Sequence, residues 1–303
     1  MKYRNFGGIK VSEIGMGCWA IGGNAYGNSY GKTNDDESIA AVRKAMELGC
    51  TFFDTADVYG HGHSERILGT ALGSARKDVV IATKAGGAYM YEGFGGMNFS
   101  KEYLNFALKQ SMLRLQTDYI DVYQLHNPPM PVIQDGEAFA ALKDMKDKGK
   151  IRFAGISIFT LEEGFAALEH VDCLQCVFNA LDPRKYELME AAKRAGVAVI
   201  IREPLANGLL TGKYDGKSEF DETDIRCRFP QDYISQIADS VFEVKKKIHR
   251  NATMSQISLK YVLAFDSVCT VIPGFKTARQ VKENIQTSDM PDLTDEEMAV
   301  FGS

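Results

Sequence analysis

One stretch of the chain gathers side chains suited to proton transfer. It runs from Asp54 through Tyr59 to Gly69, after the apolar run Cys50-Thr-Phe-Phe53 and before a helical pattern. The pattern predicts a strand end, a polar loop and a helix start, with Ser64 as N-cap. A surface loop does not need this density of Asp, Tyr and His in order to fold, which favours a functional role. The alternative is structural, with the aspartate in local turn hydrogen bonds and the tyrosine packed over it.

Two further polar residues end neighbouring strands. Val79–Lys84 is an apolar strand pattern with lysine last, and Tyr119–His126 is a strand pattern that ends in histidine before Asn127-Pro128-Pro129. In a barrel of parallel strands, all carboxyl ends open at the same mouth. The side chains expected together there are Asp54, Tyr59, Lys84 and His126.

These four residue types suit one kind of chemistry. A tyrosine is a poor acid at neutral pH because its pKa is about 10. A lysine ammonium beside the phenol lowers that pKa, and a carboxylate holds the lysine in place and charged. A histidine can hydrogen-bond a carbonyl oxygen and orient it. We interpret the group as a proton donor for a carbonyl that receives a hydride.

Nucleophilic and metal chemistry find little support. The sequence contains no G-x-S-x-G, and no cysteine is placed beside a histidine. His61 and His63 form a loop H-x-H without a third ligand, so we expect them to face solvent and predict no metal site. Cys173 and Cys176 lie on one predicted strand, and their odd separation puts them on opposite faces. This spacing argues against a zinc site or a redox pair.

The order of the predicted elements indicates a (β/α)8 TIM barrel. Eight short apolar runs alternate with helical patterns, which predicts a parallel sheet, and eight is the number that closes a barrel. An open doubly wound sheet is the competing architecture. No linker divides residues 1–303, so a single domain is expected. The predicted strands are 14–17, 51–54, 79–84, 119–126, 151–157, 173–178, 197–201 and 267–272, with a short N-terminal hairpin at 2–12 and extra C-terminal helices at 232–249, 253–264 and 277–286.

Composition narrows the class of protein. Hydrophobic residues make up 45% of the 303 residues and charged residues 25%, as in a soluble globular protein. The net charge of −5 argues against nucleic acid as a partner. No signal sequence and no apolar run of about 18 residues is present, so no membrane span is expected. Cysteines in apolar runs suit a reducing, cytoplasmic location. Nothing in the sequence sets the oligomeric state.

Several segments together resemble the aldo-keto reductase family, in the family's order and over essentially the whole chain. They are Asp54–Glu65, Thr83-Lys84, Leu125–Pro128, Glu203–Tyr214 and Val271–Asn284. The resemblance implies a (β/α)8 barrel that reduces an aldehyde or ketone with a nicotinamide cofactor, usually NADP(H), with NAD(H) possible. It makes Tyr59 the general acid, Lys84 and Asp54 its tuning pair, and His126 the group that orients the carbonyl.

The resemblance also implies residues that bind the cofactor. Ser157 and Gln175 match positions that hold the nicotinamide carboxamide, but the family's Asn is replaced by Ile158. Arg202 falls where the family has a stacking aromatic residue; it can stack, or meet Glu203 or an acidic substrate. The remaining implied cofactor residues are Leu205 and Gly208 at the pyrophosphate, Gly274, Lys276 and Thr277 at the 2′-phosphate, and Gln280 and Asn284 near adenine. For Lys276 the alternative is a solvated lysine at a helix start.

The substrate is a small-molecule carbonyl of unknown identity. Trp19 is expected to line its pocket with Tyr59 and His126, or else to pack in the core. Tyr89, Tyr91 and Phe94 would form a second wall or belong to an exposed loop. The competing function is a cofactor-sensing regulatory subunit with little turnover. The intact group of four and the absence of an N-terminal extension disfavour that reading.

Overall fold

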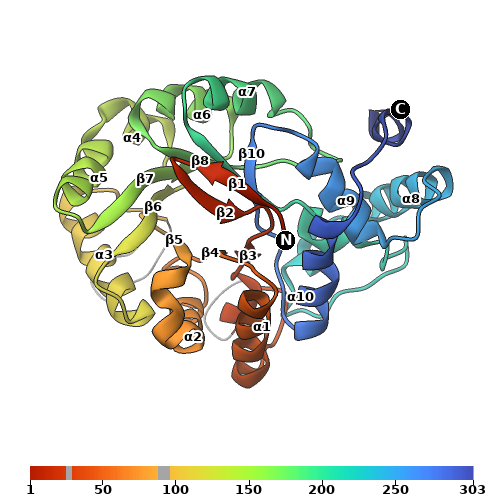
Figure 1. Ribbon diagram of the computed structural model, residues 1–303, viewed down its shortest axis with the longest axis horizontal. Coiled ribbons are helices and arrows are strands. Elements are labelled where there is room, and N and C mark those ends of the chain that lie inside the picture. Colours follow the sequence, from red (N-terminus) through yellow and green to blue (C-terminus); the bar gives the residue numbers. More distant parts are fainter. Residues whose placement is uncertain (25–28, 88–95, 303) are drawn as a thin grey trace.

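Parallel strands form the wall of a barrel in the computed structural model, which describes residues 1–24, 29–87 and 96–302 (Figure 1). Within those ranges eight strands follow one another around the wall in chain order. Isolated parallel bridges pair Ile14 with Val271 and Gly17 with Gly274, which brings the first strand against the last. The predicted (β/α)8 barrel is confirmed, and the open doubly wound sheet is not found. The strands are β3 (Met16–Gly17), β4 (Phe52–Asp54), β5 (Val80–Ala85), β6 (Ile120–His126), β7 (Ile151–Ser157), β8 (Cys173–Val177), β9 (Ala198–Arg202) and β10 (Val268–Val271).

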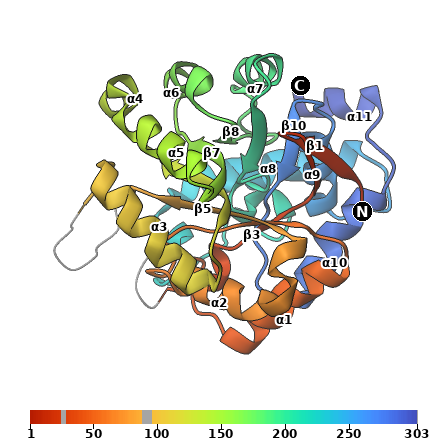
Figure 2. The same ribbon diagram turned by 60° about the vertical axis from the view of Figure 1, so that its left-hand side comes forward.

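Helices surround the barrel. In both ribbon views α4, α6 and α7 lie on one side and α1, α2 and α10 on the opposite side (Figures 1 and 2). Short α4 follows Pro128 and Pro129, where the sequence indicated only the end of a strand. The helices are α1 (Asp35–Glu47), α2 (His63–Leu72), α3 (Lys101–Leu115), α4 (Met130–Asp135), α5 (Glu137–Asp147), α6 (Leu161–Ala167), α7 (Tyr186–Arg194), α8 (Gln231–Lys247), α9 (Met254–Leu263), α10 (Ala278–Ile285) and α11 (Asp295–Ala299).

The prediction for the start of α2 is wrong. Ser64 is not the N-cap, because α2 begins at His63 after Gly62, which has a left-handed φ of 80°. Ser64 is buried, and its hydroxyl donates to the carbonyl of Cys18 at 2.7 Å. Tertiary contact with the first strand's loop thus uses the hydroxyl that the local pattern had assigned to a cap.

Alternation along the strands builds an apolar layer and a polar layer inside the barrel. Phe52, Ala82, Val122 and Cys173 belong to one buried apolar cluster inside the wall. Because side chains alternate with period two, the residues two positions further on point inward as well. Those residues are Asp54, Lys84, Gln124 and Gln175. Cys176 packs with the outward-facing core instead, which confirms that Cys173 and Cys176 lie on opposite faces.

The predicted hairpin closes one end of the barrel. Strands β1 (Tyr3–Phe6) and β2 (Ile9–Ser12) pair antiparallel and lie across the ring of strands in Figure 1. Gly7 and Gly8 form the turn with φ of 56° and 94°, a conformation that favours glycine. The Phe6 ring lies 5.5 Å from that of Phe52 and 5.4 Å from that of Phe153, so it extends the apolar layer.

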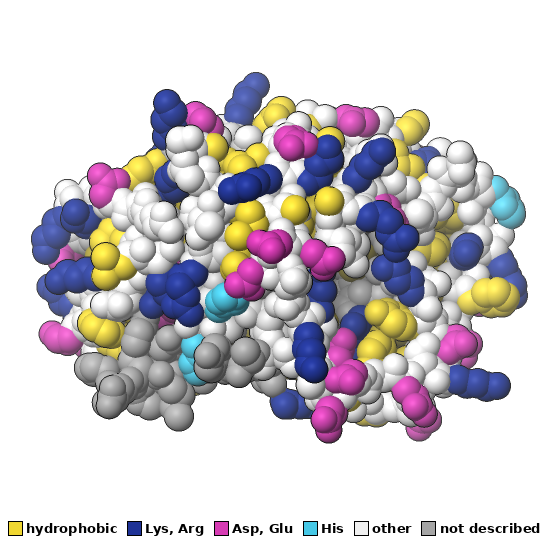
Figure 3. Space-filling model, turned by 90° about the horizontal axis from the view of Figure 1, so that it is seen from below, with side chains coloured by type: hydrophobic (Ala, Val, Ile, Leu, Met, Phe, Trp, Pro, Cys, Tyr) yellow, Lys and Arg dark blue, Asp and Glu magenta, His cyan; other side chains and the backbone are white. Residues whose placement is uncertain are grey.

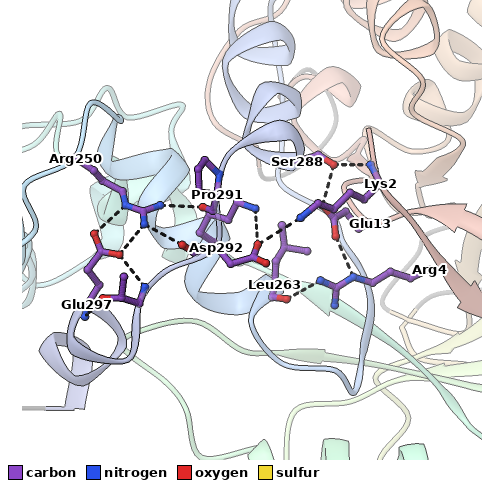
Figure 4. A network of polar contacts seen from close by, with 11 residues as sticks. Lys2, Arg4, Glu13, Arg250, Leu263, Ser288, Pro291, Asp292 and Glu297 are labelled. Carbon is purple, nitrogen blue, oxygen red and sulfur yellow. Dashed lines mark hydrogen bonds and ion pairs between the residues drawn. The ribbon is translucent and has the colours of Figure 1, made fainter.

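A polar network ties the hairpin to the C-terminal segment (Figure 4). Arg4 pairs with buried Glu13 at 3.0 Å and donates to the carbonyl of Leu263 at 2.6 Å. Glu13 also accepts from the hydroxyl of Ser288 at 2.8 Å. Segments from both ends of the sequence are therefore locked together beneath the barrel wall.

The surface shows no dominant charge on the face drawn in Figure 3. Lysine and arginine side chains are interspersed with aspartate and glutamate there. Among the described residues, no helix combines the length and the apolar character needed to cross a membrane.

Closure of the barrel depends on Gly17. A Cβ at this position would lie 2.6 Å from the carbonyl oxygen of Ile272 on the facing strand segment, and backbone cannot move aside locally. We predict that Gly17→Ala lowers the free energy of unfolding by about 2 kcal/mol, as overpacking does. Gly274→Ala is the matched control on the other side of the seam, because its Cβ would meet nothing closer than 3.9 Å. Urea unfolding measures both, and equal effects would contradict the prediction.

Candidate active site

A cavity of about 570 Å³ opens at the carboxyl ends of the strands. Most of the residues predicted to take part in catalysis, to bind the cofactor or to bind the substrate line this cavity. Lys84 lies beneath it, and Ser157 and Thr277 lie beside it. The predicted residues in its lining are Trp19, Asp54, Tyr59, His126, Gln175, Arg202, Leu205, Gly208, Gly274, Lys276, Gln280 and Asn284.

A buried ion pair forms the base of the cavity. The Nζ of Lys84 lies 2.5 Å from Oδ1 of Asp54, and it also donates to the carbonyl of Thr55 at 2.9 Å. The Lys84 side chain has no exposed surface. Tyr59 completes the group, because its hydroxyl lies 3.4 Å from the same ammonium. The structure thus brings the predicted phenol, ammonium and carboxylate into direct contact.

Burial and charge act in opposite directions on these groups. Burial raises the pKa of Tyr59, and the neighbouring Lys84 ammonium lowers it only in part, so the net shift is upward. This net direction contradicts the expectation that the Lys84 ammonium lowers the pKa of Tyr59 below its usual value. For Lys84, burial lowers the pKa, but Asp54 and Tyr59 outweigh it, and the pKa is raised. Tyr59 therefore remains a protonated donor at neutral pH, beside a lysine that remains charged.

His126 is held neutral. Burial lowers its pKa well below 6.5, and the charges of Lys84 and Arg202 act in the same direction. Its ring lies edge-on to the Tyr59 ring, with 5.9 Å between the centroids. A Cβ at Gly87 would lie 3.2 Å from Nδ1, so that nitrogen faces the loop after β5. A neutral imidazole can donate one hydrogen bond to a carbonyl oxygen.

Close contact between two loops positions Tyr59. A Cβ at Gly60 would lie 2.2 Å from the carbonyl oxygen of Gly22, and one at Gly22 would lie 3.1 Å from the backbone of Tyr59. The hydroxyls of Thr55 and Ser64 hydrogen-bond at 2.9 Å across the same loop. The loop after β4 is thus fixed at both ends, which holds the phenol over Lys84.

Two buried amides hold the far oxygen of the Asp54 carboxylate. Gln175 Nε2 donates to Asp54 Oδ2 at 2.7 Å, and Gln124 Nε2 donates to the same atom at 3.3 Å. The Oε1 of Gln175 is buried with no partner in the described part of the chain, and Gln175 lines the cavity. A free amide oxygen there fits a ligand that brings an N–H donor, as a nicotinamide carboxamide does.

Asn127 supplies an amide beside Ser157, close to where Ile158 replaces the family's Asn. It lines the cavity with a left-handed φ of 54°, and its Oδ1 accepts from the hydroxyl of Ser157 at 3.3 Å. Ile158 packs away in the outer core. An amide therefore remains next to Ser157, although it comes from a different strand.

Arg202 makes an ion pair with its neighbour. Its Nη1 lies 2.5 Å from Oε1 of Glu203, and Nη2 donates to the carbonyl of Ile158 at 3.2 Å. The guanidinium also lies 5.1 Å from the centre of the Phe159 ring. Of the alternatives raised by the sequence, the structure shows the pairing with Glu203. Both members of this ion pair, Arg202 and Glu203, line the cavity.

The other end of the cavity is basic. Tyr30 contacts Lys276 and Asn207 across it, and we call these three residues the strap. Lys276 donates through Nζ to the carbonyl oxygen of Tyr30, and its side chain is not the free, solvated lysine of the alternative reading. Thr277 and Gln280 form a capping box at the start of α10. The Tyr30 hydroxyl donates to Asn207 Oδ1 at 2.7 Å, which joins the first loop to the loop after β9.

Arg226 packs against this strap through Tyr30. It pairs with Asp224 at 2.6 Å, donates to the Tyr214 hydroxyl at 2.6 Å and lies 5.1 Å from the centre of the Tyr30 ring. Arg226 and Lys213 both line the cavity, as does Lys276, so three cationic side chains contribute to its wall.

Sequence reasoning missed several of these residues. Gln124 and Asn127 had a readable signal, because one lies two residues before His126 on the inward face and the other follows it directly. Tyr30, Asn207 and Arg226 had none, because they lie in loops and meet only through the fold.

Other site predictions have mixed outcomes. Trp19 lines the cavity, with its ring 4.9 Å from that of Tyr30 and 6.2 Å from that of Tyr59, rather than lying wholly in the core. Tyr89, Tyr91 and Phe94 lie outside the described residues. Within the described ranges, no group of three or more metal-binding side chains is found.

Comparisons with known proteins agree with this geometry. A model of the aldo/keto reductase family matches residues 13–302. The uncharacterized oxidoreductase YqkF of Bacillus subtilis is 32% identical over 97% of this chain and 93% of its own length. The aldo-keto reductase yakc [NADP(+)] of Schizosaccharomyces pombe is 30% identical over 93% of this chain and 85% of its own. The holo form of the aldo-keto reductase AKR11C1 from Bacillus halodurans superposes with a TM-score of 0.82 at 31% identity, covering 100% of this chain and 95% of that one.

The family model, the oxidoreductase relative and the superposed aldo-keto reductase together identify the chain as an oxidoreductase that uses a nicotinamide cofactor. The chain belongs to the aldo-keto reductase family.

The buried state of His126 makes stability depend on pH. Because its pKa is well below 6.5 in the folded protein, the unfolded chain binds a proton more readily as the pH falls below 6.5. The free energy of unfolding should therefore decrease between about pH 7.5 and about pH 5. His126→Gln should reduce that decrease. Urea unfolding at the two pH values tests this, and an unchanged difference between wild type and variant would contradict it.

Proposed function

We propose that the protein is an NADPH-dependent carbonyl reductase in which Tyr59 is the general acid. The observation that carries the proposal is the Tyr59 hydroxyl, which lies 3.4 Å from a lysine ammonium that is itself paired with Asp54 at 2.5 Å. When bound, the reduced nicotinamide supplies a hydride to the carbonyl carbon. Tyr59 gives its hydroxyl proton to the carbonyl oxygen, and the product is an alcohol.

The surrounding side chains divide the remaining tasks. Lys84 stabilises the phenolate that remains after proton transfer, and Asp54 keeps Lys84 charged. Neutral His126 donates a hydrogen bond to the carbonyl oxygen and so aligns it with the phenol. Trp19 forms a wall of the substrate pocket. Water is displaced from a base that is already largely buried, which strengthens each of these interactions.

The residues at the other end fit a dinucleotide. Gln175 offers its unpartnered Oε1 to the carboxamide, and Ser157 lies beside it with Asn127. Arg202 presents the flat guanidinium of its pair with Glu203 to the ring. Leu205, Gly208 and Gly274 leave backbone open along the pyrophosphate, while Thr277, Gln280 and Asn284 flank the adenosine. The NADP(+) in the name of the Schizosaccharomyces pombe relative supports the phosphorylated cofactor.

Tyr59→Phe tests the proposal. It removes only the hydroxyl, so we predict that turnover falls by at least about 10²-fold, the lower end of what a positioned general acid contributes. Cofactor affinity should remain nearly unchanged. The single tryptophan of the chain, Trp19, lines the cavity, so its fluorescence reports NADPH binding without turnover. Oxidation of NADPH with benzaldehyde and phenylglyoxal reports the reaction.

Two results would count against the reductase. Unchanged rates in Tyr59→Phe would remove Tyr59 as the acid. NADPH binding by the wild type with no turnover of any carbonyl in a broad panel would favour the cofactor-sensing alternative.

Lys276→Ala tests the choice of cofactor. A lysine that reads the 2′-phosphate contributes only with NADPH, so we predict that the variant binds NADPH roughly tenfold more weakly and NADH nearly as before. Lys213→Ala is the matched control, since this second cavity lysine should affect both dinucleotides alike. Titration of Trp19 fluorescence measures all six affinities, for the wild type and both variants with each dinucleotide. Equal weakening of NADPH and NADH by Lys276→Ala would show that Lys276 does not read the phosphate.

A further inference from the structure

Gln124 lies beneath the cavity, in the polar layer inside the barrel that also contains Asp54, Lys84 and Gln175. It lies on the inward face of β6, in register with Lys84 on β5 and with Gly155 on β7. Its side chain has no exposed surface, and it is absent from the cavity lining. Gln124 therefore cannot touch a substrate held in the cavity, and any role in the reaction must act through its neighbours.

The neighbour it reaches is Asp54. Oδ1 of Asp54 is taken by Lys84, and Oδ2 accepts from Gln175 at 2.7 Å and from Gln124 at 3.3 Å. A carboxylate only accepts hydrogen bonds, so chemistry fixes the orientation of the Gln124 amide, with its nitrogen toward Asp54. Gln175 lines the cavity and is open to a ligand, whereas Gln124 is sealed below. Gln124 is thus the donor to Oδ2 that no ligand can draw away.

The fold makes room for this amide. A Cβ at Gly155 would lie 2.8 Å from Cγ of Gln124 and 2.5 Å from Sγ of Cys173. Gly155 has no left-handed φ, so space, rather than backbone conformation, accounts for the glycine. The arrangement also has a cost, because Oε1 of Gln124 is buried with no partner in the described ranges. An apolar side chain would fill this position without that cost, so packing alone does not explain a glutamine.

We propose that Gln124 is a positioning residue of the proposed reductase, which holds the Asp54 carboxylate in place so that Lys84 stays directed at the Tyr59 hydroxyl. The proposal rests on the proposed function and extends it by one residue. A carboxylate that accepts hydrogen bonds is favoured in its ionised form, and an ionised Asp54 keeps the buried ammonium charged. The charged ammonium in turn stabilises the phenolate that forms as the proton leaves.

The charged and titratable groups around this position are few. Asp54, Lys84 and the Cys173 thiol face Gln124 from the strands packed against it, and Tyr59, His126 and Arg202 lie in the cavity above. Burial raises the pKa of Cys173, so that thiol stays neutral and contributes no charge. Replacing Gln124 by a titratable residue therefore adds one new group to a known set.

Gln124→Glu gives the sharpest test. The introduced carboxyl group, while protonated, can donate to Asp54 as the amide does. Once ionised, it repels Asp54, and two adjacent carboxylates raise the pKa at which this happens. We predict that turnover of benzaldehyde with NADPH is close to wild type at the acidic end of the measurable range and falls at least about tenfold as the pH rises, while the wild type shows no such fall. A variant profile parallel to that of the wild type would overturn the proposal.

Gln124→Met provides the second arm. Methionine fills a similar volume without a donor. We predict turnover reduced at least about tenfold at every pH, with NADPH affinity from Trp19 fluorescence unchanged and with no loss of stability in urea. Val122→Ala, two residues earlier on the same face, is the packing control; it should lower stability and leave turnover and its pH profile unchanged.

The outcomes separate this inference from the function on which it rests. If Tyr59→Phe abolishes reduction and Gln124→Met turns over like wild type, only the role of Gln124 fails. If Gln124→Met loses stability and keeps its turnover, the residue is structural. If Tyr59→Phe remains active, the proposed function itself fails, whatever the Gln124 variants do.

Discussion

The buried ammonium of Lys84 is the constraint around which the site is arranged. A cation without exposed surface needs an opposite charge in direct contact, since desolvation costs several kcal/mol. Asp54 supplies that charge, and its own second oxygen then needs donors, which the two inward glutamines provide. A buried pair of this kind adds little to stability compared with apolar packing. The presence of this ion pair at the barrel mouth therefore indicates a functional role rather than a stabilising one.

One environment gives three titratable groups different protonation states. Burial opposes the charged form of every group, so Tyr59 stays protonated and His126 stays neutral. Lys84 alone escapes, because Asp54 and Tyr59 more than offset its burial. The cavity thus has a neutral phenol and a neutral imidazole in its lining, with a fixed cation directly beneath them. This is the division of states that proton delivery to a carbonyl requires.

Sequence reasoning captured what local pattern determines. Parallel strands put Asp54, Lys84 and His126 at one mouth, so the barrel and the meeting of these side chains were predictable. Contacts between distant segments were not. Tyr30 and Asn207 are 177 residues apart and Gln175 and Asp54 are 121 apart, and no local signal links either pair. The same limit explains the phenol, whose pKa was expected to fall because the lysine was visible and the extent of burial was not.

The hairpin that closes the barrel bears on the route by which protons reach the site. Phe6 seals that end against Phe52 and Phe153, and the layer above it within the described residues is apolar. A proton relay needs polar groups or water in sequence, and the side chains of this cluster are apolar apart from the Cys173 thiol. If Tyr59 is the proton donor, as proposed above, its proton is restored from the side of the cavity, through the opening that also admits the reactants. Reprotonation of the proposed acid and exchange of ligands would then use the same opening.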